Sequence, residues 1–418
     1  MKYKVFIIVV LLGFKWSLYA QCHSELTQYA VGFNDLKSSS FSFLDDVLKD
    51  VKIVGYGEDT HGTSEFTLLA EELMTYLSDT HGFKIFVLET GFGEGQYLND
   101  YIQGKTDDLK FIMNNRNQTW RYRTKAFYQL MNALKVYNQN ATDKIHIYGC
   151  EMQYVVTDLN RIKDYLKKVD SNYTIEGFEK VNLWQNFNEQ EKVKYFNSYA
   201  KLKAYFIENY EIFKDKTSQN EFDLAFHQVE VLGQFVTAIN QNVYQRKHDF
   251  REIYMLENIQ WILNYEGRDS KLFYWAHNAH IGDTTLSGTS NSIGGLLKNS
   301  YGDYYFSIGT DFGTGNFIAY PADANETGNW RHQTFTVEKV VENTFTQCLK
   351  NLGKPNTFLN FRKAKTNMDL KLFLSEPLTQ MSGAGAQIRS NITETSYLGK
   401  EFDAIIYLNE THEIKWVD

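Results

Sequence analysis

The sequence predicts an α/β fold with a central, mostly parallel sheet flanked by helices. Short apolar and β-branched runs alternate with amphipathic helical patterns, and several runs end in glycine and polar residues, as strands do beside the ligand cleft of a parallel sheet. Residues 159–263 show helical periodicity and no convincing strand, so we interpret them as a helical insertion forming a cap over the active-site cleft. The α/β core then comprises residues 21–158 and 264–418.

The first segment, residues 1–20, has the pattern of a signal peptide. Lys2 and Lys4 precede an apolar stretch that ends in small residues at Ala20, the three regions of a secretory leader. A membrane anchor is the alternative, but Lys15 interrupts the apolar stretch, which is shorter than the roughly 20 residues that cross a bilayer. We expect cleavage after Ala20 and an exported chain, periplasmic or secreted, without stable membrane insertion.

The three cysteines bear on that expectation. Cys22 follows the cleavage site and could carry lipid, but Gln21 stands where lipoprotein processing prefers a small residue. Cys150 and Cys348 either form a disulfide in an oxidising compartment or are buried small hydrophobic residues. Their spacing leaves both possibilities open.

Six strands are expected from the apolar runs. They lie at residues 52–57, 84–89, 145–149, 271–277, 304–309 and 402–407. After the first strand, Phe66, Leu69, Leu73 and Leu77 follow the spacing of one apolar helical stripe, and a similar pattern fills residues 124–137. Strands and helices therefore alternate along the chain.

Charge excludes one class of partner. The formal net charge is −8, and we find no basic stripe of the kind that nucleic-acid binding requires. Apolar residues interrupt the short basic stretches at residues 121–125 and 163–168, which we interpret as solvated helix faces. We expect no nucleic-acid partner.

Ionisable side chains follow three of the predicted strands. The first strand is followed by Glu58, Asp59 and His61, the second ends at Glu89, and a later one is followed by His277 and His280. Each residue alone has an ordinary structural explanation, such as a helix cap or a hydrogen bond to a backbone carbonyl. Since the carboxyl ends of parallel strands share one edge of a sheet, together they predict a functional cluster there.

His61 is the candidate general base, because imidazole accepts and returns protons near neutral pH. Glu58 can orient His61 or stabilise its charged form, although capping of the following helix is a competing role. Asp59 is a weaker candidate. A serine nucleophile is disfavoured, since Ser64 lies outside any Gly-x-Ser-x-Gly context.

A metal site is the alternative chemistry. His277 and His280 form a His-x-x-His pair that could bind zinc together with Glu89 or His61. The pair lacks the His-Glu-x-x-His form, so we expect neither a metal nor another cofactor.

The segment Gly57–Phe66 resembles the Gly-Glu-x-x-His-Gly-x-x-Glu-Phe motif of the erythromycin esterase family. Further segments similar to family motifs are Glu89 and residues 98–101, 148–153, 251–261, 276–280, 294–315 and 402–404. The resemblance covers nearly the whole chain after the leader and implies the same sheet-plus-helices fold.

The resemblance also implies an activity: metal-independent hydrolysis of a macrolide lactone, a small-molecule ester, with the residue at His61 as general base for water. Glu58, Glu89 and His277 match positions of the family's site. The tetrahedral oxyanion needs an electrophilic partner, for which His277, His280 and Arg251 are candidates. Arg251 and Asp59 are expected to contact substrate.

The chain departs from the family pattern at several positions. Ala70 replaces a basic residue, Lys125 stands where acids are usual, and Glu151 replaces an aspartate. These changes leave the natural ester open. A metal- or haem-binding protein using the same cleft is the alternative function, and a helical interaction protein with a decayed site is a third. The sequence leaves the oligomeric state open.

Overall fold

The computed structural model describes residues 22–115, 119–153, 155–179, 181, 187–241, 244–284, 291–381, 385–388 and 392–417. The chain forms two compact units. The first comprises residues 1–76, 277–289 and 303–415, and the second comprises residues 77–276, 290–302 and 416–418. The expected signal peptide, residues 1–20, lies outside the described residues.

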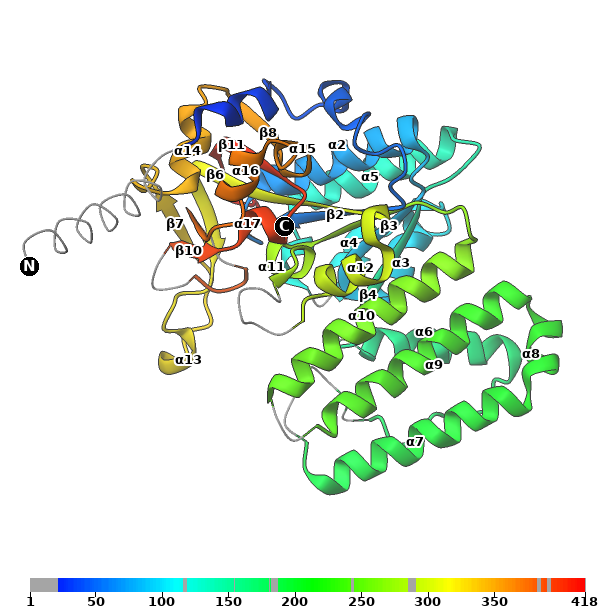
Figure 1. The fold of residues 1–418 in the computed structure, drawn as a ribbon. Coiled ribbons are helices and arrows are strands. Elements are labelled where there is room, and N and C mark those ends of the chain that lie inside the picture. The colour runs from blue at the N-terminus through cyan, green and yellow to red at the C-terminus, as the bar shows by residue number, and fades with distance from the viewer. Residues whose placement is uncertain are drawn as a thin grey trace, which may run out of the picture. The chain divides into compact units, whose positions relative to one another are not determined.

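The first unit contains a mixed sheet (Figure 1). Its strand order is β1 (Ala30–Phe33), β8 (Asn356–Asn360), β11 (Ala404–Thr411), β6 (Tyr305–Ala319) and β2 (Ile53–Glu58), with β7 (Gln333–Val337) paired to the far end of β6. β11, β6 and β2 are parallel, whereas β1, β8 and β7 pair antiparallel to their neighbours. A separate ribbon joins β9 (Leu378–Met381) and β10 (Thr393–Ser396).

Close packing explains the glycines of β2. Every residue of β2 is buried, and a Cβ on Gly55 would lie 2.4 Å from the Tyr305 hydroxyl. A Cβ on Gly57 would meet the Asn278 side chain at the same distance. The strand therefore lies against its neighbours without side chains at these two positions, and it delivers Glu58 to its carboxyl end.

The second unit contains the parallel strands β5 (Leu272–His277), β3 (Ile85–Gly91) and β4 (His146–Glu151), in that order. The helices α3 (Phe92–Ile102), α4 (Leu109–Asn115), α5 (Lys125–Asn140) and α12 (Ile293–Tyr301) belong to it as well. α5 begins where the Thr124 side chain accepts a hydrogen bond from the Phe127 N–H. The predicted helix α2 (Ser64–His81) buries its apolar stripe; its residues up to Tyr76 belong to the first unit and those from Leu77 to the second.

Five long or medium helices fill the chain between β4 and β5 (Figure 1). They are α6 (Val155–Val169), α7 (Glu189–Glu208), α8 (Tyr210–Lys216), α9 (Gln219–Ile239) and α10 (Tyr244–Glu266). α9 contacts the other four, and over half of its residues are buried. The described residues of this stretch contain no strand, in agreement with the sequence pattern. Their role as a cap stays a prediction.

Short helices complete the described chain. They are η1 (Ser24–Tyr29), η2 (Ser38–Ser40), η3 (Ser42–Leu44), η4 (Trp120–Tyr122), α11 (Asn278–Ile281), η6 (Gly302–Tyr304), α13 (Ala324–Thr327), α14 (Phe345–Asn351), α15 (Phe361–Ala364), α16 (Met368–Phe373) and α17 (Leu398–Glu401).

The predicted fold class is confirmed, since parallel strands and flanking helices build both units. All six expected strands exist, as β2, β3, β4, β5, β6 and β11. The sequence pattern did not predict five further strands, β1, β7, β8, β9 and β10. These strands have only four or five residues each and pair antiparallel, and β7 is largely exposed, so their apolar signal is weak.

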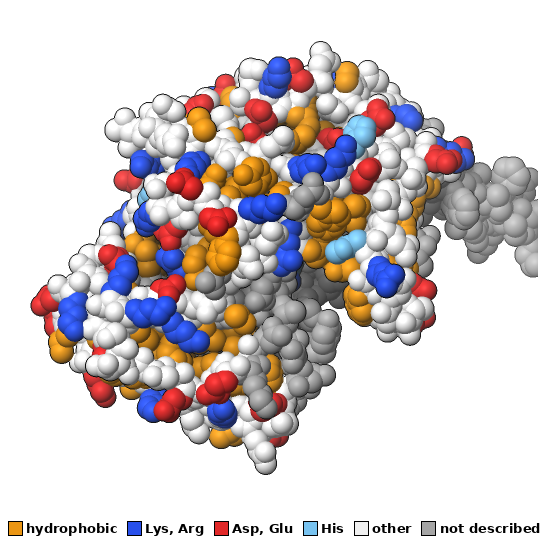
Figure 2. All heavy atoms as spheres, turned by 180° about the vertical axis from the view of Figure 1, so that it is seen from behind, with side chains coloured by type: hydrophobic (Ala, Val, Ile, Leu, Met, Phe, Trp, Pro, Cys, Tyr) orange, Lys and Arg blue, Asp and Glu red, His pale blue; other side chains and the backbone are white. Residues whose placement is uncertain are grey.

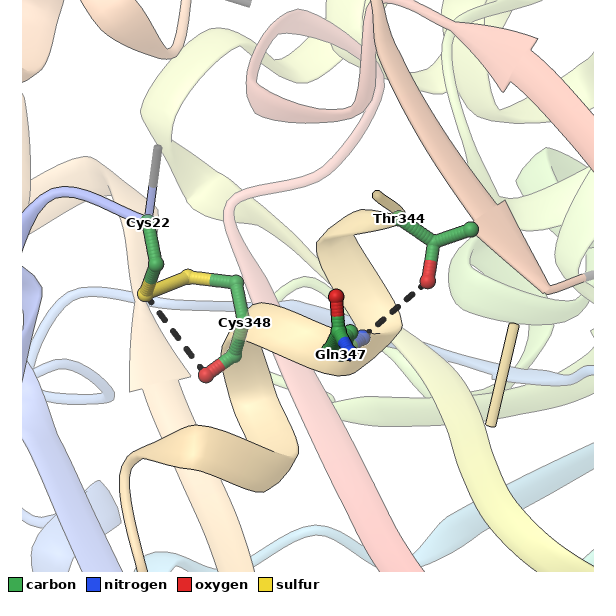
Figure 3. Close-up of a disulfide and its surroundings, with 4 residues drawn as sticks. All are labelled: Cys22, Thr344, Gln347 and Cys348. Atoms are coloured by element: carbon green, nitrogen blue, oxygen red, sulfur yellow. Dashed lines mark hydrogen bonds between the residues drawn. A yellow bond between two sulfur atoms is a disulfide. The ribbon is translucent and has the colours of Figure 1, made fainter. Parts of the chain in front are cut away.

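A disulfide joins Cys22 to Cys348, whose Cα atoms are 4.9 Å apart (Figure 3). Cys348 lies on α14, which the Thr344 hydroxyl caps by accepting from the Gln347 N–H at 3.1 Å. Cys150 is a free, buried thiol 3.5 Å from the Leu88 carbonyl oxygen. A Cys150–Cys348 disulfide, one of the two possibilities considered above, is therefore wrong.

The surface carries charges of both signs. Figure 2 shows basic and acidic side chains intermixed over one face, with apolar side chains between them. No helix among the described residues combines the length and apolar character that a membrane span requires.

Candidate active site

His61 is bonded to Glu58 at the carboxyl end of β2. The imidazole Nδ1 lies 2.6 Å from Glu58 Oε1, and the carboxylate is 2% exposed. An ionised carboxylate only accepts hydrogen bonds, so Nδ1 carries the proton and donates it. In this tautomer Nε2 is the nitrogen that accepts a proton, the same arrangement by which an aspartate orients the base of a catalytic triad.

His277 is placed beside His61 in the first unit. The two ring centroids are 5.3 Å apart, with the planes at 73°. The His277 Nδ1 accepts from the Ala279 N–H at 3.1 Å, as the N-cap of α11, and Nε2 lies 3.2 Å from the Asp59 carbonyl oxygen. An accepting Nδ1 and a donating Nε2 define a neutral imidazole with its proton on Nε2.

The loop between β2 and α2 is held against β6. The Gly62 carbonyl accepts from the N–H groups of Ile318 and Ile414 at 3.1 and 3.0 Å. A Cβ on Gly62 would lie 1.8 Å from the Ile318 carbonyl oxygen, so only glycine fits there. The glycine after His61 therefore fixes the backbone that presents the imidazole.

Gly385 faces both imidazoles. A Cβ built on Gly385 would lie 3.6 Å from His61 Nε2 and 3.5 Å from His277 Nε2. A larger side chain at this position would therefore lie against the proton-accepting nitrogen of His61. Sequence reasoning did not find Gly385, which lies in a loop without a motif or a regular pattern.

Asp59 forms a buried acidic pair with Asp311 of β6. The Asp59 N–H donates to Thr310 Oγ1 at 2.9 Å, and the Asp311 side chain accepts from Thr346 at 2.6 Å. Burial raises the pKa of Asp311, and the charge of Asp59 raises it further, against the lowering effect of the Thr346 hydrogen bond. Asp311 therefore favours its neutral form, while the Asp59 backbone carbonyl lies 3.2 Å from His277 Nε2.

His280 lies in the last turn of α11, one turn after His277, and is partly exposed. α11 is joined to β6 through Asn278, which donates to the Thr310 carbonyl at 2.8 Å and accepts from its N–H at 3.0 Å. The first unit thus brings Glu58, Asp59, His61 and His277 together, with His280 on the adjoining helix.

The second unit holds an arginine–glutamate cluster. Glu89 and Glu151 share an edge because β3 and β4 are parallel neighbours. Arg251 of α10 donates to Glu89 Oε1 at 3.0 Å and, through Nε, to Glu151 Oε1 at 2.6 Å. Arg121 pairs with Glu89 Oε2 at 3.1 Å, and Glu252 lies 3.8 Å from Arg251.

The carboxylates of this cluster stabilise the charge of Arg251. Burial opposes the charged form of Arg251, but the carboxylates of Glu151, Glu89 and Glu252 outweigh it and raise its pKa above the usual range. Two guanidinium groups and three carboxylates therefore form one buried network of ion pairs. The network holds the end of Glu89 in one orientation.

Arg121 corrects one sequence interpretation. The stretch at residues 121–125 is not a solvated helix face, because Arg121 is 4% exposed and bonded to Glu89. The sequence did not reveal this pairing, since Arg121 lies in a short 3-10 helix far from the strand motifs. Lys125, by contrast, is exposed at the start of α5.

Among the described residues, no group of three or more His, Cys, Asp or Glu side chains is arranged to hold a metal ion. The histidines lie in the first unit and the arginine–glutamate cluster in the second. What the first unit offers by itself is an oriented base, Glu58–His61, beside a neutral imidazole donor.

The family model and two curated relatives that match this chain name the same family. Residues 79–411 match the family model described as erythromycin esterase. The chain is 25% identical to the erythromycin esterase type II of Escherichia coli over 357 residues, which span 77% of this chain and 83% of that protein. It is 20% identical to the type I enzyme of the same organism, over 60% of this chain and 67% of that protein.

Solved structures share the fold. A Bacillus cereus protein superposes with a TM-score of 0.81 at 24% identity, covering 94% of this chain and 98% of the other. An erythromycin esterase mutant in its open conformation superposes with a TM-score of 0.66 at 16% identity, covering 93% and 99%.

Proposed function

Because the chain belongs to the erythromycin esterase family, we propose that it hydrolyses a carboxylic ester or lactone with His61 as the general base. The observation that carries the proposal is the Glu58–His61 hydrogen bond, which leaves Nε2 as the proton acceptor. The neighbouring His277 supplies a second imidazole, and Gly385, which has no side chain, lies beside both rings.

The reaction follows from this geometry. His61 Nε2 takes a proton from water while the water oxygen attacks the ester carbonyl carbon, and Glu58 stabilises the imidazolium that forms. The tetrahedral oxyanion then collapses with cleavage of the bond to the alkoxy oxygen, which receives the proton from His61. The products are an acid and an alcohol, which stay joined when the substrate is a lactone.

The oxyanion needs a hydrogen-bond donor during this step. His277, His280 and Arg251 remain the candidates. The His277 Nε2–H lies next to His61 but is donated to the Asp59 carbonyl at 3.2 Å, so His277 would have to share that proton with the oxyanion. Glu89 is proposed as the residue that orients Arg251, since they are 3.0 Å apart. Asp59 is proposed to position His277 through its carbonyl.

We further propose a macrolide as one substrate of this class. The names of the two Escherichia coli relatives support it. Ala70 is fully buried within α2 and Lys125 is exposed on α5, so neither of these two departures from the family alters the Glu58–His61 pair directly.

The experiment is mass spectrometry of a macrolide and simple-lactone panel after incubation with the protein, because ring opening adds one water. Replacement of His61 by Ala should lower kcat by about 10²–10⁴-fold on any lactone that is opened. Glu58→Gln should lower kcat while KM changes little. Glu208→Gln, an exposed position on α7, is the matched control. Unchanged kcat in His61→Ala would refute the proposed base, and a silent panel would refute the esterase activity.

Export is a separate proposal. A disulfide between Cys22 and Cys348 is expected in an oxidising compartment, and a Cys22 sulfur in that bond has no valence for lipid. Cell fractionation with intact-mass analysis tests it. A mature chain beginning at Gln21 outside the cytoplasm supports the proposal, and a cytoplasmic chain retaining residues 1–20 contradicts it.

A further inference from the structure

The helices of the second unit enclose a groove that the proposed esterase mechanism does not use. It has a volume of about 390 Å³ and is lined by residues of α7, α9 and α10. Tyr199 lines it from α7, His227 and Glu230 from α9, and Glu257 and Trp261 from α10. Cavities that bind small molecules commonly measure about 300–1,000 Å³.

One wall of the groove is a stack of aromatic rings. Trp261 lies flat on His227, with centroids 3.9 Å apart and planes at 8°, and Tyr265 stacks behind Trp261 at 4.9 Å. The edge contact of Phe92 with His227, at 4.7 Å, completes the packing. The imidazole is 5% exposed and held in a fixed plane.

The bonding around His227 defines its tautomer. Against the lowering effect of burial, the Asn258 side chain acts on His227 as a hydrogen-bond acceptor, an effect that raises the His227 pKa. Both N–H groups of the Asn258 amide are engaged, with the Cys150 carbonyl at 2.8 Å and Gln234 Oε1 at 3.0 Å. Asn258 can therefore only accept from His227, through Oδ1, which also accepts from Gln234 Nε2 at 3.1 Å. His227 therefore donates from Nδ1, and its Nε2 carries a lone pair.

Within the described part of the chain, His227 Nε2 is buried without a hydrogen-bond partner. Burial lowers the pKa of His227 to about 3, so the ring stays neutral at physiological pH and Nε2 can only accept. Buried polar atoms of this kind normally have a partner. An N–H group of a ligand would supply the hydrogen-bond donor that His227 Nε2 lacks.

The carboxylates of the groove differ in their pairing. Glu230 is 3.0 Å from Lys203, whose charge compensates it. Glu257 receives only a long hydrogen bond from Gln234, at 3.4 Å, and no ion pair joins it to another described residue. Burial raises the pKa of Glu257, with a smaller opposing effect of Gln234. A cation in the groove would pair with Glu257.

We propose that this groove binds a small protonated aromatic amine, whose ammonium group donates to Glu257 and His227 Nε2 while its ring packs among Tyr199, Tyr254 and Trp261. An ammonium beside aromatic faces also gains cation–π attraction. Glu257, Asn258 and Trp261 belong to the motif at residues 251–261, for which the esterase mechanism assigns a role only to Arg251. The proposal does not depend on ester hydrolysis.

The test compares two probes that differ in one group. Tryptamine carries an ammonium, and indole-3-ethanol carries a neutral hydroxyl at the same place. Calorimetric titration of the full chain at pH 7 should show one tryptamine site, with indole-3-ethanol bound at least about tenfold more weakly. Absence of tryptamine binding at millimolar concentration, or equal affinity for the two probes, would overturn the proposal.

Matched variants locate the site. Glu257→Gln should weaken tryptamine binding about tenfold, whereas Glu208→Gln removes an equal charge from the exposed side of α7 and should leave it unchanged. Equal affinities of the two variants would show that tryptamine binds elsewhere and would refute the assignment. The two-probe comparison uses the unmodified chain, so it stands even when a variant folds poorly.

Discussion

Removal of the Cys22–Cys348 disulfide should destabilise the first unit. The bond closes a loop with a sequence separation of 326 residues, for which the chain-entropy model gives about 6 kcal/mol at 25 °C. Measured losses on removing native disulfides are about 2–5 kcal/mol, and we expect that range for a Cys22→Ser, Cys348→Ser variant. With about 2–4 °C per kcal/mol, the Tm should fall by roughly 4–20 °C.

The assay is calorimetry of the wild type and the variant, each with and without a reductant. Reductant should lower the Tm of the wild type to that of the double serine variant and should not affect the variant. Cys150→Ala is the control, because Cys150 is a free thiol and its removal should leave the sensitivity to reductant intact.

Thiol titration under denaturing, non-reducing conditions counts the free cysteines directly. One reactive thiol, Cys150, is expected. Three reactive thiols in protein purified from its native compartment, or a Tm that the double replacement leaves unchanged, would refute the reasoning.

Three further predictions concern the first unit and α2. Gly385→Val should lower kcat/KM at least about tenfold, because its side chain would lie against His61 Nε2. Gly385→Ala, whose Cβ makes only ordinary contacts, should retain activity. Equal rates of the two variants would contradict the placement of Gly385 beside His61. Gly62→Ala should cost about 1–3 kcal/mol in urea unfolding, because its Cβ would overlap the Ile318 carbonyl oxygen, and an unchanged urea midpoint would argue against that contact. Burial and the neighbouring Glu72 raise the pKa of Glu71 from its ordinary 4.5 to about 7, so its stability contribution is present below pH 4.5 and is lost as the pH rises through 7. Glu71→Gln should therefore raise the Tm at pH 8 and not at pH 4, and parallel melting curves of the two proteins across this range would disprove the pKa assignment.

The sequence by itself determined the elements that depend on local pattern. The run from β2 through His61 into α2 could be predicted because strand periodicity, glycine and helical spacing are properties of neighbouring residues. The Glu58–His61 contact belongs to the same class, since three residues separate the partners within one turn. The helical character of residues 159–263 could be predicted for the same reason, because helical periodicity is a local pattern.

The tertiary structure alone decided which distant residues meet. Arg121 pairs with Glu89, Arg251 with Glu151, and Gly385 faces His61, although no local pattern distinguishes these positions. The pairing of Cys22 with Cys348 likewise joins positions 326 residues apart. Such contacts depend on strand order and on the packing of whole helices, so they follow from the global minimum of the chain and not from the spacing of any one segment.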